Sequence, residues 1–188
     1  MNYNLETDRL NLTCLTKASA LLVHAFYEEN ATYFDPYELT RPDQFYTVAF
    51  QTAVLEWEWK EMQAGRCLRY YIFLKSEPTT IIGTVNLSNI RMGKLRNASI
   101  GYKIDHRFRN QGYATEACKC LLEYAYKELH FHRIVAEIIP LNMPSIRVVK
   151  SLGFIQEGVE REAAEINGKW QDLLLFAKLN PYVNSVIQ

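Results

Sequence analysis

The segment from Asn97 to Pro140 constrains the fold of this chain most, because it is expected to form a strand, a helix and a second strand. Residues 97–104 are expected to form the first strand, and residues 133–140 are apolar and β-branched. Between them, residues 115–130 place apolar side chains on or near one helical face. A helix between two strands is long enough for a crossover, so we expect parallel strands with a right-handed connection.

The turn between the first strand and the helix has the sequence Arg-Asn-Gln-Gly-Tyr-Ala at residues 109–114. Such a turn exposes backbone N–H groups that have no partner inside the helix, at the positive end of the helix dipole. These two features together favour the binding of an anion such as phosphate. Gly112 is followed by Tyr-Ala and not by the lysine of a P-loop. We therefore expect a phosphate that is held rather than transferred.

The rest of the chain is expected to complete a mixed α+β fold in one domain, residues 1–188, without repeats or linkers. Further strands are expected at residues 10–15, 69–75, 81–90, 159–166 and 169–178. Further helices are expected from the N-cap Thr16 to residue 30, at residues 43–64, and from the N-cap Asn142 to residue 152. Short turns, including Asn167-Gly168, favour antiparallel neighbours.

Composition narrows the function and the setting of the protein. Lys+Arg and Asp+Glu are each 21, so the net charge is zero, which argues against electrostatic nucleic-acid binding as the main role. The four cysteines contain no C-x-x-C pair and are expected to be free thiols in a reducing cytosol. Residues 1–6 are polar, and no apolar run approaches a membrane span. Histidines such as His130 and His132 lack further ligands at metal-binding spacing. We expect a soluble cytoplasmic protein without a metal or a membrane partner.

The order of these elements and the turn together resemble the GNAT N-acetyltransferase superfamily. The acetyl-CoA signature of that family is Arg/Gln-x-x-Gly-x-Gly/Ala, and Arg109, Gly112 and Ala114 fit it. The blocks Asn142-Met-Pro-Ser145 and Ser151-Leu-Gly-Phe154 look like the next segment of the family.

Three features are similar to the RimJ/RimL-like group, the ribosomal-protein alanine acetyltransferases. They are the opening Glu6-Thr-Asp-Arg-Leu-Asn-Leu12, the Asn-x-x-Ser spacing at residues 142–145, and Ile166-Asn-Gly-Lys-Trp-Gln-Asp172. The resemblance covers essentially the whole chain. It implies a mixed, mostly antiparallel sheet of about seven strands, splayed at the acetyl-CoA site and flanked by about four helices.

The resemblance also implies how acetyl-CoA is bound. Backbone N–H groups near the turn would hold the pyrophosphate, and the pantetheine arm would lie along the end of the preceding strand. Asn142 would cap its helix, contact the pantetheine, or do both. The residues expected at the cofactor site are Tyr102, Lys103, Ile104, Arg109, Asn110, Gln111, Gly112, Tyr113, Ala114, Thr115, Asn142 and Ser145.

The reaction implied is direct attack by an amine on the thioester in a ternary complex. Many members of the superfamily protonate the leaving thiolate with a tyrosine seven residues after the equivalent of Asn142, but this chain has Val149 there. Ser145 is the expected substitute, as in the RimL-like group. Glu162 and Glu165 are the candidate bases, and only one of them can face the site if the strand is regular.

The acceptor is expected to be a protein α-amine, such as the N-terminus of a ribosomal protein. Neutralising a lysine of pKa about 10.4 at pH 7 costs roughly 4–5 kcal/mol, whereas an α-amine of pKa about 7.7–8.0 costs only about 1 kcal/mol. A small amine, such as a polyamine, an amino acid or a drug, remains an alternative acceptor. A catalytically silent acyl-CoA-binding module is a second alternative. Either a monomer or a homodimer is compatible with the sequence.

Overall fold

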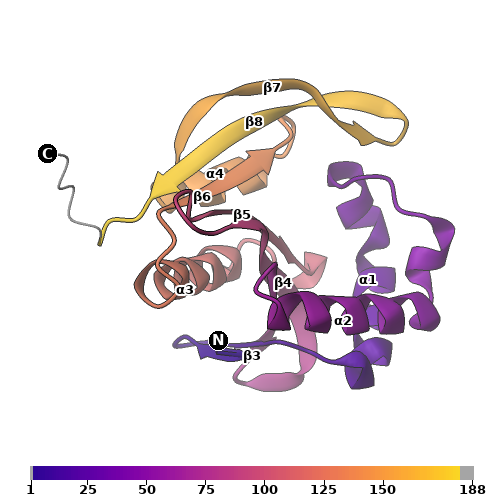
Figure 1. The fold of residues 1–188 in the computed structure, drawn as a ribbon. Coiled ribbons are helices and arrows are strands. Elements are labelled where there is room, and N and C mark those ends of the chain that lie inside the picture. The colour runs from indigo at the N-terminus through magenta and orange to yellow at the C-terminus, as the bar shows by residue number, and fades with distance from the viewer. Residues whose placement is uncertain (1, 183–188) are drawn as a thin grey trace, which may run out of the picture.

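One eight-stranded sheet forms the centre of the protein (Figure 1). The computed structural model describes residues 2–182. In sheet order the strands are β1 (Asn4–Glu6), β2 (Leu10–Thr13), β3 (Leu68–Leu74), β4 (Glu77–Arg91), β5 (Asn97–Ile104), β6 (Arg133–Ile138), β8 (Lys169–Leu179) and β7 (Ile155–Ile166). All neighbours are antiparallel except β5 and β6. The predicted mixed sheet with one parallel pair is confirmed, with β1 as an eighth strand.

Helices cover the two faces of this sheet (Figure 1). Helices α3 (Tyr113–Lys127) and α4 (Met143–Ser151) pack on one face, where their apolar side chains join those of β5 and β6 in the main core. Helices α1 (Ala20–Phe34) and α2 (Val48–Gln63) pack on the other face, against Tyr71 and Phe73 of β3. In the described part of the chain, four short 3₁₀ helices join the longer elements, at Lys17–Ser19, Asp35–Tyr37, Asp43–Tyr46 and His106–Phe108.

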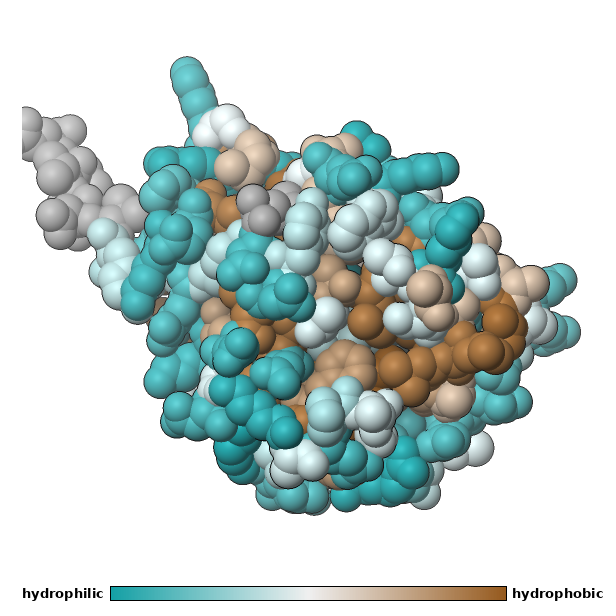
Figure 2. Space-filling view, turned by 90° about the horizontal axis from the view of Figure 1, so that it is seen from below, coloured by the Kyte–Doolittle hydropathy of each residue, from teal (hydrophilic) through white to brown (hydrophobic). Residues whose placement is uncertain are grey.

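We name the face of the sheet that carries α1 and α2 the open face, because these two helices cover only part of it. These helices cover its β3–β4 half, which contains the second cluster of buried apolar residues. The β5–β6 half lies beyond them, and a hollow opens there. Figure 2 shows the molecule from below the view of Figure 1, on the side away from the β7–β8 hairpin. This side is mainly hydrophilic at its rim, and apolar side chains gather across its middle.

Three helices begin at other residues than predicted. Thr47 caps α2 by accepting a hydrogen bond from the Phe50 N–H, so that helix begins after a separate 3₁₀ turn. Gly112 precedes α3 in a left-handed conformation with φ +82°, and the helix begins two residues earlier than predicted. Thr16 makes no side-chain cap, and α1 begins only at Ala20.

The predicted hairpin around Asn167-Gly168 is confirmed, with φ values of +51° and +72° that suit a type I′ turn. It arches over the sheet toward the connection between α1 and α2 (Figure 1). At its tip, the Asn167 N–H donates to Thr40 Oγ1 over 3.0 Å. The hairpin and the helical side of the molecule therefore meet above the open face. Within residues 2–182, no helix has the length and apolarity needed to cross a membrane.

Candidate functional site

A wedge between β5 and β6 is the main candidate site. The two strands pair only from Asn97 with Arg133 to Ser99 with Val135. Beyond Ser99, residues 100–104 continue to pair with β4 along one edge, while their other edge no longer meets β6. That free edge can accept an extended ligand as an added strand. The predicted splay is present, and it begins directly after Ser99.

The predicted anion turn lies at the end of β5 and has the geometry of a backbone cradle. Asn110 and Gly112 both have left-handed conformations, with φ values of +60° and +82°. No N–H group from Asn110 to Thr115 donates a hydrogen bond to another described residue. A side chain at Gly112 would be strained, and its Cβ would lie 3.4 Å from Arg9 Nη2. The free N–H groups and the start of α3 can together hold an anion.

An ion pair between the N-terminal segment and α3 supports the turn on one side. Arg9 Nε and Nη2 lie 2.7 and 2.6 Å from Glu116 Oε2, and Arg9 Nη1 donates to the Gln111 carbonyl over 3.1 Å. Thr7 Oγ1 donates to Glu116 Oε1 over 2.6 Å. Burial would raise the pKa of Glu116, but these hydrogen bonds outweigh it and hold the pKa below its usual range. The guanidinium of Arg9 also lies over the ring of Tyr113, 4.5 Å from its centroid.

A buried carboxylate supports the turn from the side of α1. Asp105 is fully buried between β5 and the turn. Its Oδ1 accepts the Arg107 N–H over 2.8 Å, and its Oδ2 accepts Arg107 Nη2 over 2.7 Å. Asn30 of α1, also fully buried, donates to Asp105 Oδ2 over 3.0 Å and accepts the His106 N–H over 2.9 Å. Sequence reasoning did not select Asn30, Asp105 or Arg107; the contacts of Asn30 with Asp105 and His106 join parts of the chain that are 75 and 76 residues apart.

Arg109, the first residue of the signature, contacts α1 in this structure. Its Nη2 lies 3.4 Å from the Tyr33 carbonyl, and its guanidinium lies over the Tyr33 ring. The Tyr33 ring also stacks on the ring of His106, with the two ring centroids 4.3 Å apart. Arg109 thus helps to seat the turn against α1, and its exposed side chain remains near the cradle.

The first turn of α4 brings two predicted residues to the wedge. Asn142 caps the helix, since its Oδ1 accepts the Ser145 N–H over 3.2 Å. Ser145 Oγ lies 2.7 Å from Tyr102 Oη, which also donates to the Ser145 carbonyl over 2.9 Å. Burial raises the pKa of Tyr102 well above its usual value. Val149, at the position of the usual tyrosine, is fully buried in the core.

The remaining cofactor candidates on β5 differ in direction. Ile104 points into the main core, opposite Gly83 of β4. Lys103 points to the open face, where its Nζ lies 2.5 Å from Glu38 Oε1, and burial lowers its pKa to about 8. Neither side chain enters the wedge, so any contact of these residues with a ligand there would come from the backbone.

The two predicted bases lie on β7, the edge strand of the sheet, which β8 separates from β6. Residues 161–163 of β7 face the single residue Asp172 of β8, because the pairing shifts between Glu160 and Ala164. Glu162 stands in this bulge with φ +47°, and its N–H donates to Asp172 Oδ1. Glu165 is opposite exposed Trp170, while its buried neighbours Ala164 and Ile166 turn to the other side of the hairpin. The regular strand assumed in the prediction is wrong, because the bulge breaks the alternation.

Two other carboxylates share the open face. Ile134, Ala136 and Ile138 of β6 enter the core with α3, so Glu137 points to the opposite face. Glu160 of β7 is directly opposite Leu173 of β8, on the same face as Glu137. Among the described residues, neither carboxylate forms an ion pair. Burial, and then the charge of Glu160, raise the pKa of Glu137.

A hollow of about 470 Å³ lies on the open face where β5 and β6 begin to separate. Its lining includes Asn89, Arg91, Asn97, Ser99, Val135 and Glu137. The hollow therefore lies beside the wedge and contains one of the two unpaired carboxylates. Sequence reasoning missed Glu137, because its direction depends on which face of β6 is buried.

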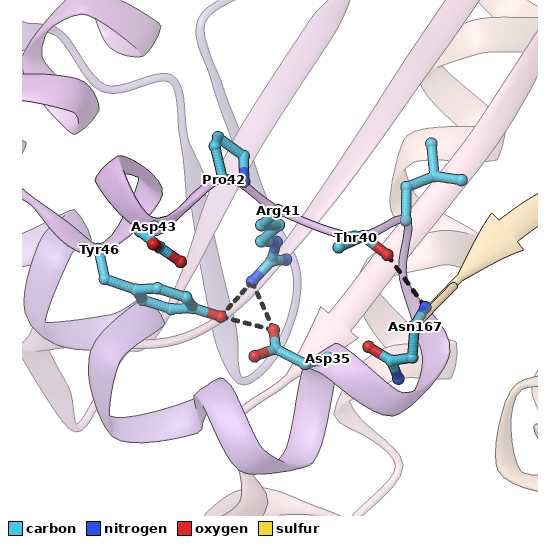
Figure 3. A pocket seen from close by; sticks show the side chains of 8 residues that line it. Asp35, Thr40, Arg41, Pro42, Asp43, Tyr46 and Asn167 are labelled. Atoms are coloured by element: carbon cyan, nitrogen blue, oxygen red, sulfur yellow. Dashed lines mark hydrogen bonds and ion pairs between the residues drawn. The ribbon is translucent and has the colours of Figure 1, made fainter. Parts of the chain in front are cut away.

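A smaller cavity of about 180 Å³ lies between the α1–α2 connection and the hairpin tip (Figure 3). Arg41 points toward Asp35 and Tyr46, and Tyr46 Oη donates to Asp35 Oδ1 over 2.5 Å (Figure 3). Arg41 also pairs with Glu38, which joins this cluster to Lys103. These contacts hold the connection against the open face and form one wall above it.

Within residues 2–182, no three His, Cys, Asp or Glu side chains are arranged to hold a metal ion. All four cysteines are free thiols, as predicted. Burial raises the pKa of Cys14 to about 12, which keeps this thiol protonated and unreactive at neutral pH.

Residues 9–155 match the family model described as an acetyltransferase (GNAT) domain, and the chain belongs to this family of N-acetyltransferases. It is 37% identical over 153 residues to a Bacillus subtilis protein named "Probable N-acetyltransferase YjcK", covering 81% of this chain and 84% of that protein.

Two solved structures show the same fold. The ribosomal-protein-S5-alanine acetyltransferase from Vibrio fischeri superposes with a TM-score of 0.91 at 26% identity, covering 97% of this chain and 100% of the other. RimJ from Mycobacterium smegmatis, solved in complex with CoA-disulfide, superposes with a TM-score of 0.85 at 26% identity, covering 90% and 81% of the two chains. The predicted GNAT fold, the resemblance to the RimJ-like group and the acyltransferase activity are confirmed.

Proposed function

We propose that this chain transfers the acetyl group of acetyl-CoA to the α-amine of a protein N-terminus, as a ribosomal-protein-alanine type of acetyltransferase. The observation that carries this proposal is the combination of a splayed β5–β6 wedge with a cradle of free N–H groups at its end. A related chain of the same fold is solved with a CoA-disulfide, and another is named for ribosomal protein S5 alanine. A ribosomal acceptor is made in the cytoplasm, and the proposal assigns the enzyme to that compartment.

The chemistry of the site fits acetyl-CoA. The N–H groups of Gln111 to Thr115 would hold the pyrophosphate, and Gly112 lets the backbone approach it closely. The free edge of residues 100–104 would pair with the amide groups of the pantetheine arm. The thioester would then lie near Ser99, beside the hollow on the open face.

In the reaction, the neutral amine attacks the thioester carbonyl carbon, a C–N bond forms, and the C–S bond breaks with its electron pair going to sulfur. The proton lost by the amine passes to a carboxylate on the open face, and we assign Glu137 to this role with Glu160 beside it. The departing thiolate accepts a hydrogen bond from Ser145 Oγ and takes its proton from solvent on release. Glu137 thus acts on the amine from one face of the sheet, and Ser145 acts on the sulfur from the other face.

An α-amine suits this arrangement, because a single carboxylate suffices for it. At neutral pH an α-amine is neutralised at a cost of about 1 kcal/mol, against roughly 4–5 kcal/mol for a lysine. The hollow beside Glu137 on the open face offers an approach for an extended peptide end.

The test is a transfer assay with purified chain, acetyl-CoA and three amines. A peptide beginning with alanine, the same peptide with a blocked N-terminus and an internal lysine, and spermidine would be compared by thiol release and by mass spectrometry. We expect acetylation of the free α-amine alone. Faster transfer to spermidine would overturn the peptide assignment. CoA binding without transfer to any of the three amines would identify a silent module instead.

Replacing Ser145 with alanine is expected to lower kcat about tenfold with little change in acetyl-CoA affinity. One hydrogen bond to a charged atom contributes about 1.5–3 kcal/mol, and water in the open wedge replaces part of it. Steady-state kinetics and calorimetry with CoA would measure both quantities. An unchanged kcat would remove Ser145 from the mechanism.

A further inference from the structure

A direct contact bridges the wedge on the side of α3 and α4. Tyr102 belongs to the part of β5 that has separated from β6, and Ser145 belongs to the helix that follows β6. Tyr102 is opposite Val85 of β4 and packs against the main core. Its ring therefore lies on the face of the sheet that carries α3 and α4, where it reaches the first turn of α4. The two hydroxyl oxygens are 2.7 Å apart. This contact therefore closes the back of the wedge.

The hydrogen bonds of this pair allow two arrangements. The Ser145 carbonyl can only accept, so when the phenol donates to it, the Ser145 hydroxyl can donate to Tyr102 Oη. When the phenol instead donates to Ser145 Oγ, the Ser145 hydrogen is free to point elsewhere. Rotations of the two O–H groups, the phenol of Tyr102 and the hydroxyl of Ser145, separate the two arrangements. In the second arrangement, Ser145 Oγ accepts a hydrogen bond from Tyr102, and its own hydrogen is free to be donated to the leaving sulfur. The first hydrogen bond then polarises the second.

We propose that Tyr102 is a positioning residue for the leaving group, which holds the Ser145 hydroxyl at the back of the wedge and donates to it as the C–S bond breaks. The inference rests on the proposed function, and it assigns a role that Ser145 cannot fill alone. No covalent step passes through Tyr102. Its phenol changes hydrogen-bond acceptor, from the Ser145 carbonyl to Ser145 Oγ, and keeps its proton.

This role of Tyr102 can replace the tyrosine that many members of the superfamily carry at the position of Val149. Val149 is fully buried in the main core, and its side chain has no hydroxyl, so this position supplies no hydrogen-bond donor to the thiolate. Tyr102 comes from a different element, β5, and reaches the sulfur side through Ser145. The phenol and the hydroxyl together form a donor pair where many members of the superfamily use one phenol.

The test is the single-turnover rate of acetyl transfer in Tyr102→Phe, which removes one oxygen and retains the ring. We expect this rate to fall about tenfold, because the hydrogen bond that holds and polarises the Ser145 hydroxyl is lost. The dissociation constant for CoA is expected to change less than about twofold, since β5 offers its backbone edge and not this hydroxyl. In the Ser145→Ala background, Tyr102→Phe should have no further effect on the rate, because the two residues act as one unit.

The matched control is Tyr126→Phe. Tyr126 is a buried tyrosine of α3 on the same side of the sheet, and its Oη donates to the Lys178 carbonyl over 2.9 Å, away from the wedge. It should retain the wild-type rate. A wild-type rate in Tyr102→Phe, or rate losses that multiply in the double variant, would overturn the inference while the proposed function stands. Loss of folding in Tyr102→Phe but not in Tyr126→Phe would also overturn it, since the tyrosine would then be structural. A wild-type chain that binds CoA but transfers no acetyl group overturns the proposed function itself.

Discussion

Replacing Glu137 with glutamine is expected to lower kcat/KM for the acceptor about 100-fold, the lower end of what a positioned general base contributes. Glu137 lies on the open face, next to the point where β5 and β6 separate, and it lines the hollow beside the wedge. Glutamine has nearly the same shape and cannot take the amine proton. Steady-state kinetics with an alanine-starting peptide would measure the change, and CoA affinity should remain within about twofold.

Glu165→Gln is the matched control, because it makes the same chemical change on the other side of the hairpin, where Trp170 lies opposite. It should retain wild-type kinetics. If Glu165→Gln lost activity and Glu137→Gln did not, the assignment from strand direction would be wrong, and the base would belong to β7 as the sequence alone suggested.

The pH dependence gives a second readout of the same carboxylate. Burial, and then the charge of Glu160, raise the pKa of Glu137, so the acid limb of kcat should lie above the ordinary range of a glutamate. Glu160→Gln removes the like charge, which favours the ionised form of Glu137 and lowers its pKa. The acid limb is therefore expected to move to lower pH in that variant. A shift to higher pH, or no shift, would separate Glu160 from the titrating group.

Local sequence signals predicted the parts of the fold that depend on local structure. The strand Asn97–Ile104 has the predicted bounds, since it ends where the chain enters the turn. The turn itself was found from the small residue Gly112 and the helix behind it, and Asn142 was recognised as an N-cap. Each of these features depends on residues within one helical turn or one strand of one another.

The parts that were missed depend on how distant segments meet. The direction of Glu137 is set by the packing of β6 on α3, and the bulge in β7 moves Glu162 out of a regular alternation. Arg9 and Glu116 are 107 residues apart in sequence, and Asn30 and Asp105 are 75 apart. The resemblance to the RimJ-like group pointed to the segment containing Arg9, but gave no physical reason for it. Its contact with the Gln111 carbonyl supplies that reason.

Asp105→Ala is expected to lower the free energy of unfolding by about 3 kcal/mol, because a fully buried carboxylate and its paired donors are disrupted together. The exposed partner of the same arginine is the control: Arg107 Nη2 also lies 2.8 Å from Glu29 Oε2, with both side chains about half exposed. Glu29→Ala should cost less than about 1 kcal/mol. Urea unfolding of the two variants would measure the difference.

The pH dependence of stability follows from the same contacts. Burial would raise the pKa of Asp105, but hydrogen bonds from Arg107 and Asn30 outweigh it and hold the pKa below the usual value of 3.8. The stabilisation is therefore present above pH 3.8 and is lost as the pH falls through the lower pKa of the folded state. Asp105→Ala should lose this acid transition, so its deficit relative to wild type should shrink at low pH.

Because Asp105 and Asn30 anchor the chain just before the cradle, Asp105→Ala should also weaken CoA binding, whereas Glu29→Ala should not. Equal stability in the two variants would show that the buried contacts do not hold the turn. A destabilised Asp105→Ala that bound CoA as tightly as wild type would show that the cradle forms without this anchor. In that case the contacts of Arg9 with Glu116 and the Gln111 carbonyl, on the other side of the turn, would be sufficient to position it.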